Sequence, residues 1–172
     1  MKTLRLALAG NPNAGKSTIF NALTGSHQHV GNWPGKTVEQ KSGHFQYQDY
    51  TIEIVDLPGT YSLAAFSPEE MIARDYLINE QPDAVITVLD ASNLERNLYL
   101  AVQVLELGIP TIIVLNMTDV AEAKGLQIDD QRLSQALHSP IIRTVAREGK
   151  GIDTLIQGVI AAAEDGAGYA FA

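Results

Sequence analysis

The stretch GNPNAGKST, from Gly10 to Thr18, constrains the fold most strongly because a short apolar run precedes it and a helical pattern follows it. The spacing GxxxxGKS is that of a phosphate-binding loop between a β-strand and an α-helix. Glycines let the backbone curl so that successive N–H groups point inward, and the start of the helix adds partial positive charge. We expect Lys16 to reach the β- and γ-phosphates and Ser17 to bind Mg²⁺. The residues expected to hold nucleotide in this loop are Gly10, Asn13, Ala14, Gly15, Lys16, Ser17 and Thr18.

Short apolar runs alternate with helical patterns along the whole chain, which predicts βα units around a mostly parallel sheet. Strands are expected at residues 4–9, 37–47, 50–56, 84–90, 111–116 and 141–145. Helices are expected at 16–24, from a capping box at 67–70, from 94 to a stop at 108–110, at 129–137 and at 152–163. The prediction is a three-layer α/β domain with a six-stranded sheet and about five helices over residues 1–165, followed by a tail or boundary at 166–172.

Composition excludes several classes of protein. The 172 residues carry a formal net charge of −8, which argues against nucleic acid as a partner and against a broad anionic membrane surface. There are no cysteines, so neither disulfides nor thiolate metal sites form. No run approaches the ~20 consecutive apolar residues that a bilayer span needs, and the N-terminus lacks the pattern of a signal peptide.

The motif NMTD follows an expected buried strand and predicts the site that reads the base. Asn116 fixes the loop, and Asp119 accepts hydrogen bonds from N1–H and the 2-amino group of guanine, a donor pair that adenine lacks. Met117 stands where many GTPases carry Lys, so a cationic contact over the base is lost. In the last loop, Ala146 is expected to offer its N–H to guanine O6, and Val145 replaces a Ser that commonly supports the Asp. We therefore expect modest affinity and fast GDP release.

Two further segments are expected to sense Mg²⁺ and the γ-phosphate. Asp56, in the motif DLPG, can hold Mg²⁺ through water, and the N–H of Gly59 can bond the γ-phosphate. Thr37, in the loop VGNWPGKTVE, is placed to put its hydroxyl on Mg²⁺ when the γ-phosphate is present; an ordinary strand threonine is the alternative. Both loops are expected to order with GTP and to relax after hydrolysis.

Hydrolysis is expected to be slow because familiar catalytic groups are missing. Thr60 stands where many GTPases carry Gln, and residues 26–38 contain no Arg. The side-chain carbonyl of Asn13, with backbone carbonyls of Gly31 and Trp33 closing over it, can hold a monovalent cation in place of an Arg. The alternative is that Asn13 only stabilises its own loop. The residues assigned to catalysis are Asn13, Lys16, Thr37 and Gly59.

Several motifs together resemble one family. The chain is similar to the N-terminal G domain of FeoB, the ferrous iron transport protein B of bacteria, in GNPNAGKSTIFNALTG, VGNWPGKTVE, DLPGTYSL, LERNLYLAVQVLELGIP and LNMTDVAE. The similarity runs from about residue 3 to residue 160, and the last loop departs from the family's Ser-Ala pattern at Val145.

The resemblance implies a Ras-like P-loop GTPase fold and a GTP-binding, GTP-hydrolysing switch domain, with GTP or GDP, Mg²⁺ and K⁺ as cofactors. It implies K⁺ in the cation site, with Asn13 and switch-loop carbonyls as ligands. The chain looks like an isolated G domain, without the helical and transmembrane domains that are its expected partners. The implied parent protein is a transporter that can form an oligomer. In that parent, this domain is expected on the cytoplasmic face of the bacterial inner membrane.

Other functions stay open on the sequence alone. A GTP- and GDP-sensing module with negligible turnover fits the missing Gln and Arg. GTPases of RNA modification or ribosome assembly carry similar phosphate loops, although the acidic balance argues against them, and NxxD argues against a P-loop kinase. His27 and His29 are interpreted as part of a solvated loop rather than as metal ligands. Three roles stay open for Trp33: stacking on a base, docking a partner, or an exposed switch-loop aromatic that packs in one nucleotide state.

Overall fold

One seven-stranded sheet organises the part of the chain that the computed structural model describes, residues 1–165; the expected tail at 166–172 lies outside the described residues. The strand order is β2-β3-β4-β1-β5-β6-β7. The strands are β1 (Lys2–Gly10), β2 (Gln28–Asn32), β3 (Glu39–Tyr47), β4 (Tyr50–Asp56), β5 (Ala84–Asp90), β6 (Thr111–Asn116) and β7 (Ile141–Arg143). The α-helices are α1 (Lys16–Thr24), α2 (Pro68–Glu80), α3 (Leu94–Glu106), α4 (Thr118–Ala123), α5 (Asp130–Leu137) and α6 (Ile152–Asp165).

The central strands run parallel and end at one edge of the sheet. β1 pairs in parallel with β4 and β5, and β6 pairs in parallel with β5 and β7, whereas β3 is antiparallel to both β2 and β4. All residues of β6 are buried, as expected for a strand covered on both faces. The carboxyl ends of β1, β4, β5 and β6 therefore meet at the edge where open α/β sheets bind their ligands.

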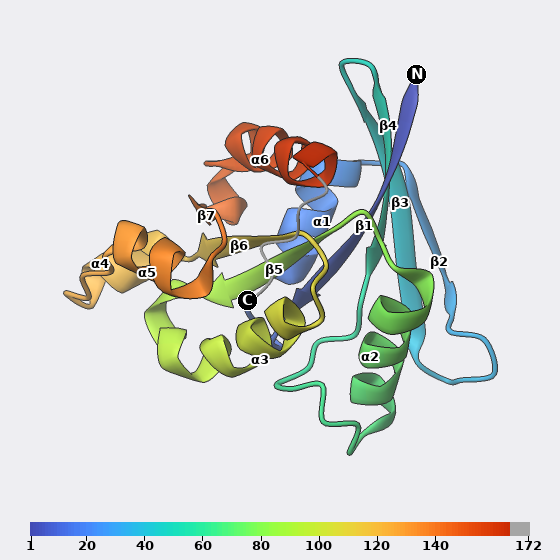
Figure 1. The fold of residues 1–172 in the computed structure, drawn as a ribbon, viewed down its shortest axis with the longest axis horizontal. Coiled ribbons are helices and arrows are strands. Elements are labelled where there is room, and N and C mark those ends of the chain that lie inside the picture. Colours follow the sequence, from blue (N-terminus) through green and yellow to red (C-terminus); the bar gives the residue numbers. More distant parts are fainter. Residues whose placement is uncertain (166–172) are drawn as a thin grey trace.

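Helices cover both faces of this sheet (Figure 1). Successive side chains of β1 point to opposite faces of the sheet, and both faces are apolar. Leu6 and Leu8 join the core beneath α1 and α6, whereas Ala7 and Ala9 join the core beneath α2 and α3. A third cluster joins α3, α4 and α5 to the β5–β6 end of the sheet. These three layers confirm the predicted fold class.

Local signals place the ends of two helices as expected. α1 begins at Lys16 and stops before Gly25, whose N–H donates to the Asn21 carbonyl at 2.9 Å. Ser67 caps α2, because its hydroxyl oxygen accepts the Glu70 N–H at 3.1 Å. The hydroxyl also donates to the Glu70 carboxylate at 3.1 Å.

The prediction of six strands is wrong, because the described residues form seven. The additional strand, β2, lies at the sheet edge with the sequence QHVGN, and only Gly31 is even partly buried. Such a strand shows no alternation of apolar residues, so the sequence predicts a loop there. Its backbone nevertheless pairs with β3, for example His29 with Ser42.

Helix number and two strand ends also differ from the prediction. The described residues contain six α-helices rather than about five, because the six-residue α4 is too short to show a helical apolar stripe. β3 begins at Glu39 rather than at Thr37, and β7 ends at Arg143. Val145, expected in that last strand, instead forms an isolated antiparallel bridge with Lys150.

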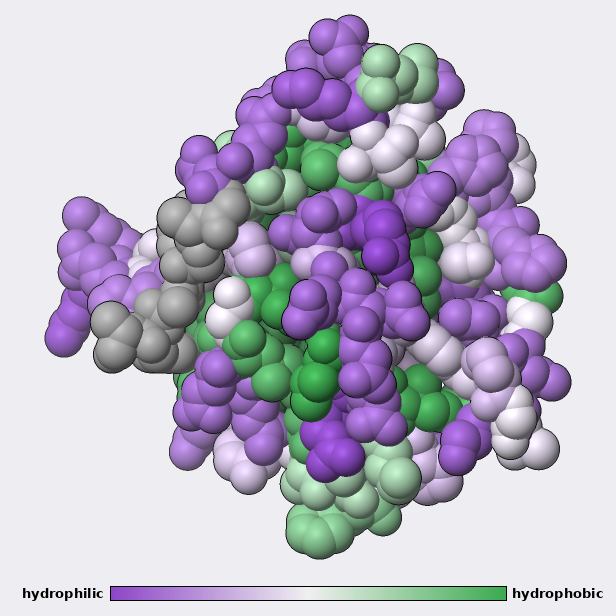
Figure 2. Space-filling model, turned by 45° about the vertical axis from the view of Figure 1, so that its right-hand side comes forward, coloured by the Kyte–Doolittle hydropathy of each residue, from purple (hydrophilic) through white to green (hydrophobic). Residues whose placement is uncertain are grey.

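Hydrophilic residues cover most of the face drawn in Figure 2, and hydrophobic residues show mainly in its recesses and along its lower edge. Among residues 1–165, the most exposed large apolar side chain is that of Phe66, at 92% exposure. No helix within residues 1–165 is long and apolar enough to cross a bilayer.

The cap of α2 yields a test of local stability. Replacing Ser67 by Ala removes the acceptor for the Glu70 N–H and is expected to lower the free energy of unfolding by about 1 kcal/mol. Urea denaturation measures the change, with the exposed Ser26→Ala as a control expected within about 0.5 kcal/mol of the parent. Equal midpoints for both variants would show that the cap contributes nothing.

Candidate functional site

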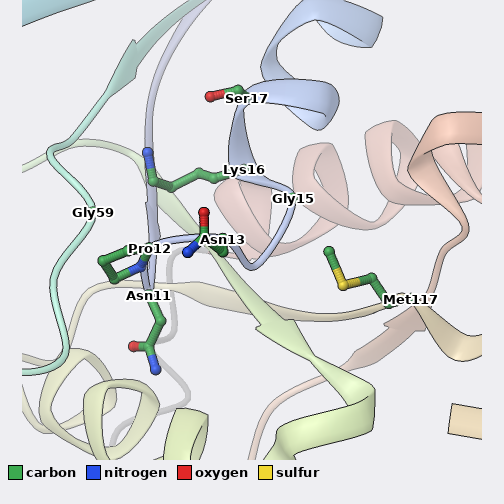
Figure 3. A pocket seen from close by; sticks show the side chains of 8 residues that line it. All are labelled: Asn11, Pro12, Asn13, Gly15, Lys16, Ser17, Gly59 and Met117. Atoms are coloured by element: carbon green, nitrogen blue, oxygen red, sulfur yellow. The ribbon is translucent and has the colours of Figure 1, made fainter. Parts of the chain in front are cut away.

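The loop between β1 and α1 forms the wall of an open pocket of about 530 Å³. Its backbone enters the left-handed region at Asn13 (φ 68°) and at Gly15 (φ 94°), which curls the chain around the pocket at the start of α1. Figure 3 shows Lys16 extending past Asn13 toward the segment that carries Gly59, with Ser17 on the first turn of the helix. The pocket is lined by Asn11, Pro12, Asn13, Gly15, Lys16, Ser17, Gly59 and Met117.

A buried ion pair lies beside this pocket. Lys16 Nζ is 2.5 Å from Asp56 Oδ1, and each side chain is only 10% exposed. Burial raises the pKa of Asp56, and the neighbouring ammonium of Lys16 opposes that rise. Because an isolated buried charge is costly, removing either partner would leave the other buried and unpaired. The wall thus offers a cation for an anionic ligand and an oxygen ligand for a hard metal ion.

The DLPG segment is held against the phosphate-loop motif. The Thr60 N–H donates to the Gly10 carbonyl at 3.1 Å. A Cβ added to Gly59 would lie 3.3 Å from the Pro12 backbone, so this glycine permits a close approach. Gly59 therefore faces the same pocket as Lys16.

The side chain of Asn116 connects three segments. Its Nδ2 donates to the Ala14 carbonyl at 3.0 Å, and its Oδ1 accepts from Thr144 Oγ1 at 2.9 Å and from the Ala146 N–H at 3.0 Å. Asn116 is only 3% exposed, so these bonds are shielded from water. They fix the end of β6 relative to the loops after β1 and β7.

A second, smaller pocket of about 130 Å³ lies next to the first. Gly15 and Met117 line both pockets, and Met117 adopts a positive φ of 60° at the start of α4. Asp119, in the first turn of α4, forms an ion pair with Arg147. This pocket is lined by Gly15, Thr18, Asn116, Met117, Asp119, Val120, Val145, Ala146 and Arg147.

The residues of the loop VGNWPGKTVE that are expected to contact the ligand or its cations lie outside both pockets. Gly31 is part of β2 and pairs with Gln40. Trp33 is 7% exposed and packs in the core, with its ring centroid 5.6 Å from that of Tyr76 on α2. Thr37 is exposed. Residues 31–37 would therefore have to move for these groups to meet a ligand beside Asn13.

Arg147, which lines the smaller pocket, is not among the residues predicted from the sequence. The available signal was its place directly after Ala146, on the loop expected to face the base. Of the two histidines interpreted as part of a solvated loop, both are exposed, but His29 lies in strand β2 rather than in a loop. The ring of His27 instead lies beside that of His44, with the two centroids 5.0 Å apart. Among the described residues, no group of three or more His, Cys, Asp or Glu side chains could hold a metal ion.

Gly15 provides a test of how closely the loop after β1 approaches Asn116 at the end of β6. Its φ of 94° is strained for other residues, and a Cβ there would lie 2.0 Å from Asn116 Nδ2. Gly108 has a similar φ of 79° but open space around the added Cβ. We expect Gly108→Ala to lower the free energy of unfolding by about 1 kcal/mol and Gly15→Ala by about 3 kcal/mol. Equal losses in urea denaturation would mean that the Gly15–Asn116 approach is not tight.

Comparison with known proteins gives a consistent family. The family model described as ferrous iron transport protein B matches residues 4–159. The Fe(2+) transporter FeoB of Escherichia coli is 52% identical over 159 residues, which cover 90% of this chain and 21% of that protein. The chain thus spans about a fifth of the length of the curated relatives that it matches.

Solved structures agree in fold. The FeoB G domain of Methanococcus jannaschii matches with a TM-score of 0.85 and 44% identity, covering 96% of this chain and 100% of that one. An S. thermophilus NFeoB variant described as bound to GDP matches with a TM-score of 0.85 and 48% identity, covering 92% of this chain and 61% of that one. With the phosphate-loop geometry and the family match over most of its length, this chain belongs to the ferrous iron transport protein B family and is an N-terminal FeoB G domain.

Proposed function

We propose that this domain binds GTP and GDP with Mg²⁺, hydrolyses GTP slowly, and acts as the nucleotide switch of a ferrous iron transporter. The observation that carries the proposal is that the two pockets share Gly15 and Met117 in their walls. A ligand with a phosphate tail and a planar base would span both. A related protein described as bound to GDP supports a guanine nucleotide as that ligand.

The phosphate pocket suits a triphosphate and its metal. Lys16 would exchange Asp56 for phosphate oxygens, while curled backbone N–H groups and the Gly59 N–H would bind further oxygens. The Ser17 hydroxyl and the Asp56 carboxylate are the hard oxygen ligands that Mg²⁺ prefers, and Thr37 is proposed as the ligand that depends on the γ-phosphate. When bound, Mg²⁺ neutralises charge on the phosphates.

The second pocket suits guanine. Asp119 would accept N1–H and the 2-amino group, with Met117 and Val145 contacting the ring. The Ala146 N–H would reach O6 only by sharing the bond that it now makes to Asn116. This weak support for the base, together with Met117 in the place of a Lys, favours modest nucleotide affinity and fast GDP release.

Hydrolysis is proposed to depend on a monovalent cation rather than on an arginine. Thr60 is 5% exposed and its N–H is bonded to Gly10, so neither its length nor its placement suits the orientation of water. Asn13 lines the phosphate pocket, and carbonyls of Gly31 and Trp33 would join it after residues 31–37 move. Bound there, K⁺ would supply the charge that an arginine supplies in other GTPases.

A GTP- and GDP-sensing module with negligible turnover is the second candidate. The burial of Thr60 favours it, because no other side chain in the described pocket wall is an evident base for water. In either case we propose that residues 1–165 form the G domain and that its partners are helical and membrane domains of a parent transporter. That parent would place this domain on the cytoplasmic face of the inner membrane, in a protein that can oligomerise.

Competition binding tests the base assignment. With Mg²⁺ present, GTP and GDP should displace a fluorescent guanine nucleotide at concentrations at least about 100-fold below those of ATP and XTP, since only guanine satisfies Asp119. Asp119→Asn should reverse the preference toward XTP, because an amide can donate to the 2-oxo group of xanthine. Equal displacement by ATP and GTP in the parent protein would refute guanine specificity.

Salt substitution tests the cation assignment. GTP turnover should be at least about tenfold faster in KCl than in NaCl at equal ionic strength, and Asn13→Ala should remove that difference. Nucleotide affinity, measured in parallel, separates a catalytic loss from a loss of binding. Equal turnover of the parent protein in both salts would exclude the cation role, and single-turnover rates near zero in both would favour the sensing module.

A further inference from the structure

Arg147 occupies the carboxylate that the proposed function assigns to guanine. Its guanidinium forms an ion pair with Asp119 Oδ2, and both residues line the smaller pocket. The Arg147 side chain is 66% exposed and that of Asp119 is 30% exposed. Resting on the proposed function, we infer that Arg147 competes with the guanine base for Asp119 and thereby sets how fast the nucleotide leaves.

The loop that carries Arg147 is held in a closed turn. The Glu148 N–H donates to the Val145 carbonyl at 2.9 Å, and the Gly149 N–H donates to the Ala146 carbonyl at 3.0 Å. Val145 and Lys150 exchange two backbone hydrogen bonds of 3.2 Å, which close the base of the turn. Arg147 is therefore presented to Asp119 from a fixed backbone.

The two ligands of Asp119 are chemically alike. A guanidinium and the N1–H and 2-amino edge of guanine are both planar sets of N–H donors that match a carboxylate. An ionised carboxylate accepts but does not donate, so it gains from either donor set. Guanine must displace Arg147 from Oδ2 or share that oxygen with it, and Arg147 returns to the carboxylate as guanine departs.

An adenine nucleotide is not expected to compete with Arg147. Adenine lacks the N1–H and 2-amino donors of guanine, so it would leave the Asp119–Arg147 pair intact. The competition therefore weakens only the binding of bases that use the carboxylate. Because the Arg147 side chain is mostly exposed to solvent and that of Asp119 is partly exposed, the effect of the pair is limited to about two- to fivefold.

The primary experiment compares GDP release from the parent protein and from Arg147→Ala. With a fluorescent GDP analogue and Mg²⁺, Arg147→Ala should release GDP about two- to fivefold more slowly and bind it more tightly by a similar factor. Lys150→Ala removes a cation from the same turn without contacting Asp119 and should leave both values unchanged. Release from Arg147→Ala that is as fast as in the parent, or faster, would overturn the inference.

A second pair of variants tests whether the effect of Arg147 depends on the Asp119 carboxylate. In Asp119→Asn, which is expected to bind XDP, adding Arg147→Ala should leave XDP release unchanged because no carboxylate remains to compete for. A slowing of XDP release equal to that for GDP would place the effect elsewhere and overturn the competition. The parent's preference for GDP over ADP, measured in the same assay, tests the proposed function separately: its loss refutes guanine binding, whereas its presence with no Arg147 effect refutes only this inference.

Discussion

The three hydrogen bonds of the Asn116 amide are the constraint on which the site depends. One donor bond of 3.0 Å reaches the loop after β1, and two accepted bonds reach the loop after β7. In a buried environment, such bonds are costly to leave unmade, so the three loops cannot separate independently. The close approach of Gly15 to Asn116 Nδ2 shows how little space separates them. This arrangement places the two pockets side by side with shared walls.

Charge is paired within each pocket in the same manner. Lys16 is bound to Asp56 beside the larger pocket, and Arg147 is bound to Asp119 in the smaller one. A ligand that carries phosphates and a guanine edge would exchange partners with these groups rather than meet unpaired charges. Exchange of partners makes the net gain on binding smaller than the gross attraction, because the protein's own pairs are lost. The two pairs differ in burial, so the exposed Asp119–Arg147 pair exchanges at the lower cost.

The sequence predicted the parts of the fold that carry strong periodic signals. The phosphate loop, the central apolar strands and the cap at Ser67 follow from spacing and residue type alone. β2 and α4 were missed because both are short and show no apolar stripe, so their formation depends on partners elsewhere in the chain. Trp33 shows the same limit, since its local sequence left three roles open. Its packing against Tyr76 depends on where α2 lies.

The sequence by itself determined the chemistry available to this protein: a curled loop with Lys16 and Ser17, a carboxylate at Asp119, and no Gln or Arg in the usual catalytic places. These features are local, since spacing along the chain fixes which backbone and side-chain groups a turn can present. Only the tertiary structure decided which groups meet. It paired Asp119 with Arg147 and drew Trp33 into the core, because contacts between residues distant in sequence depend on how the sheet aligns its strand ends.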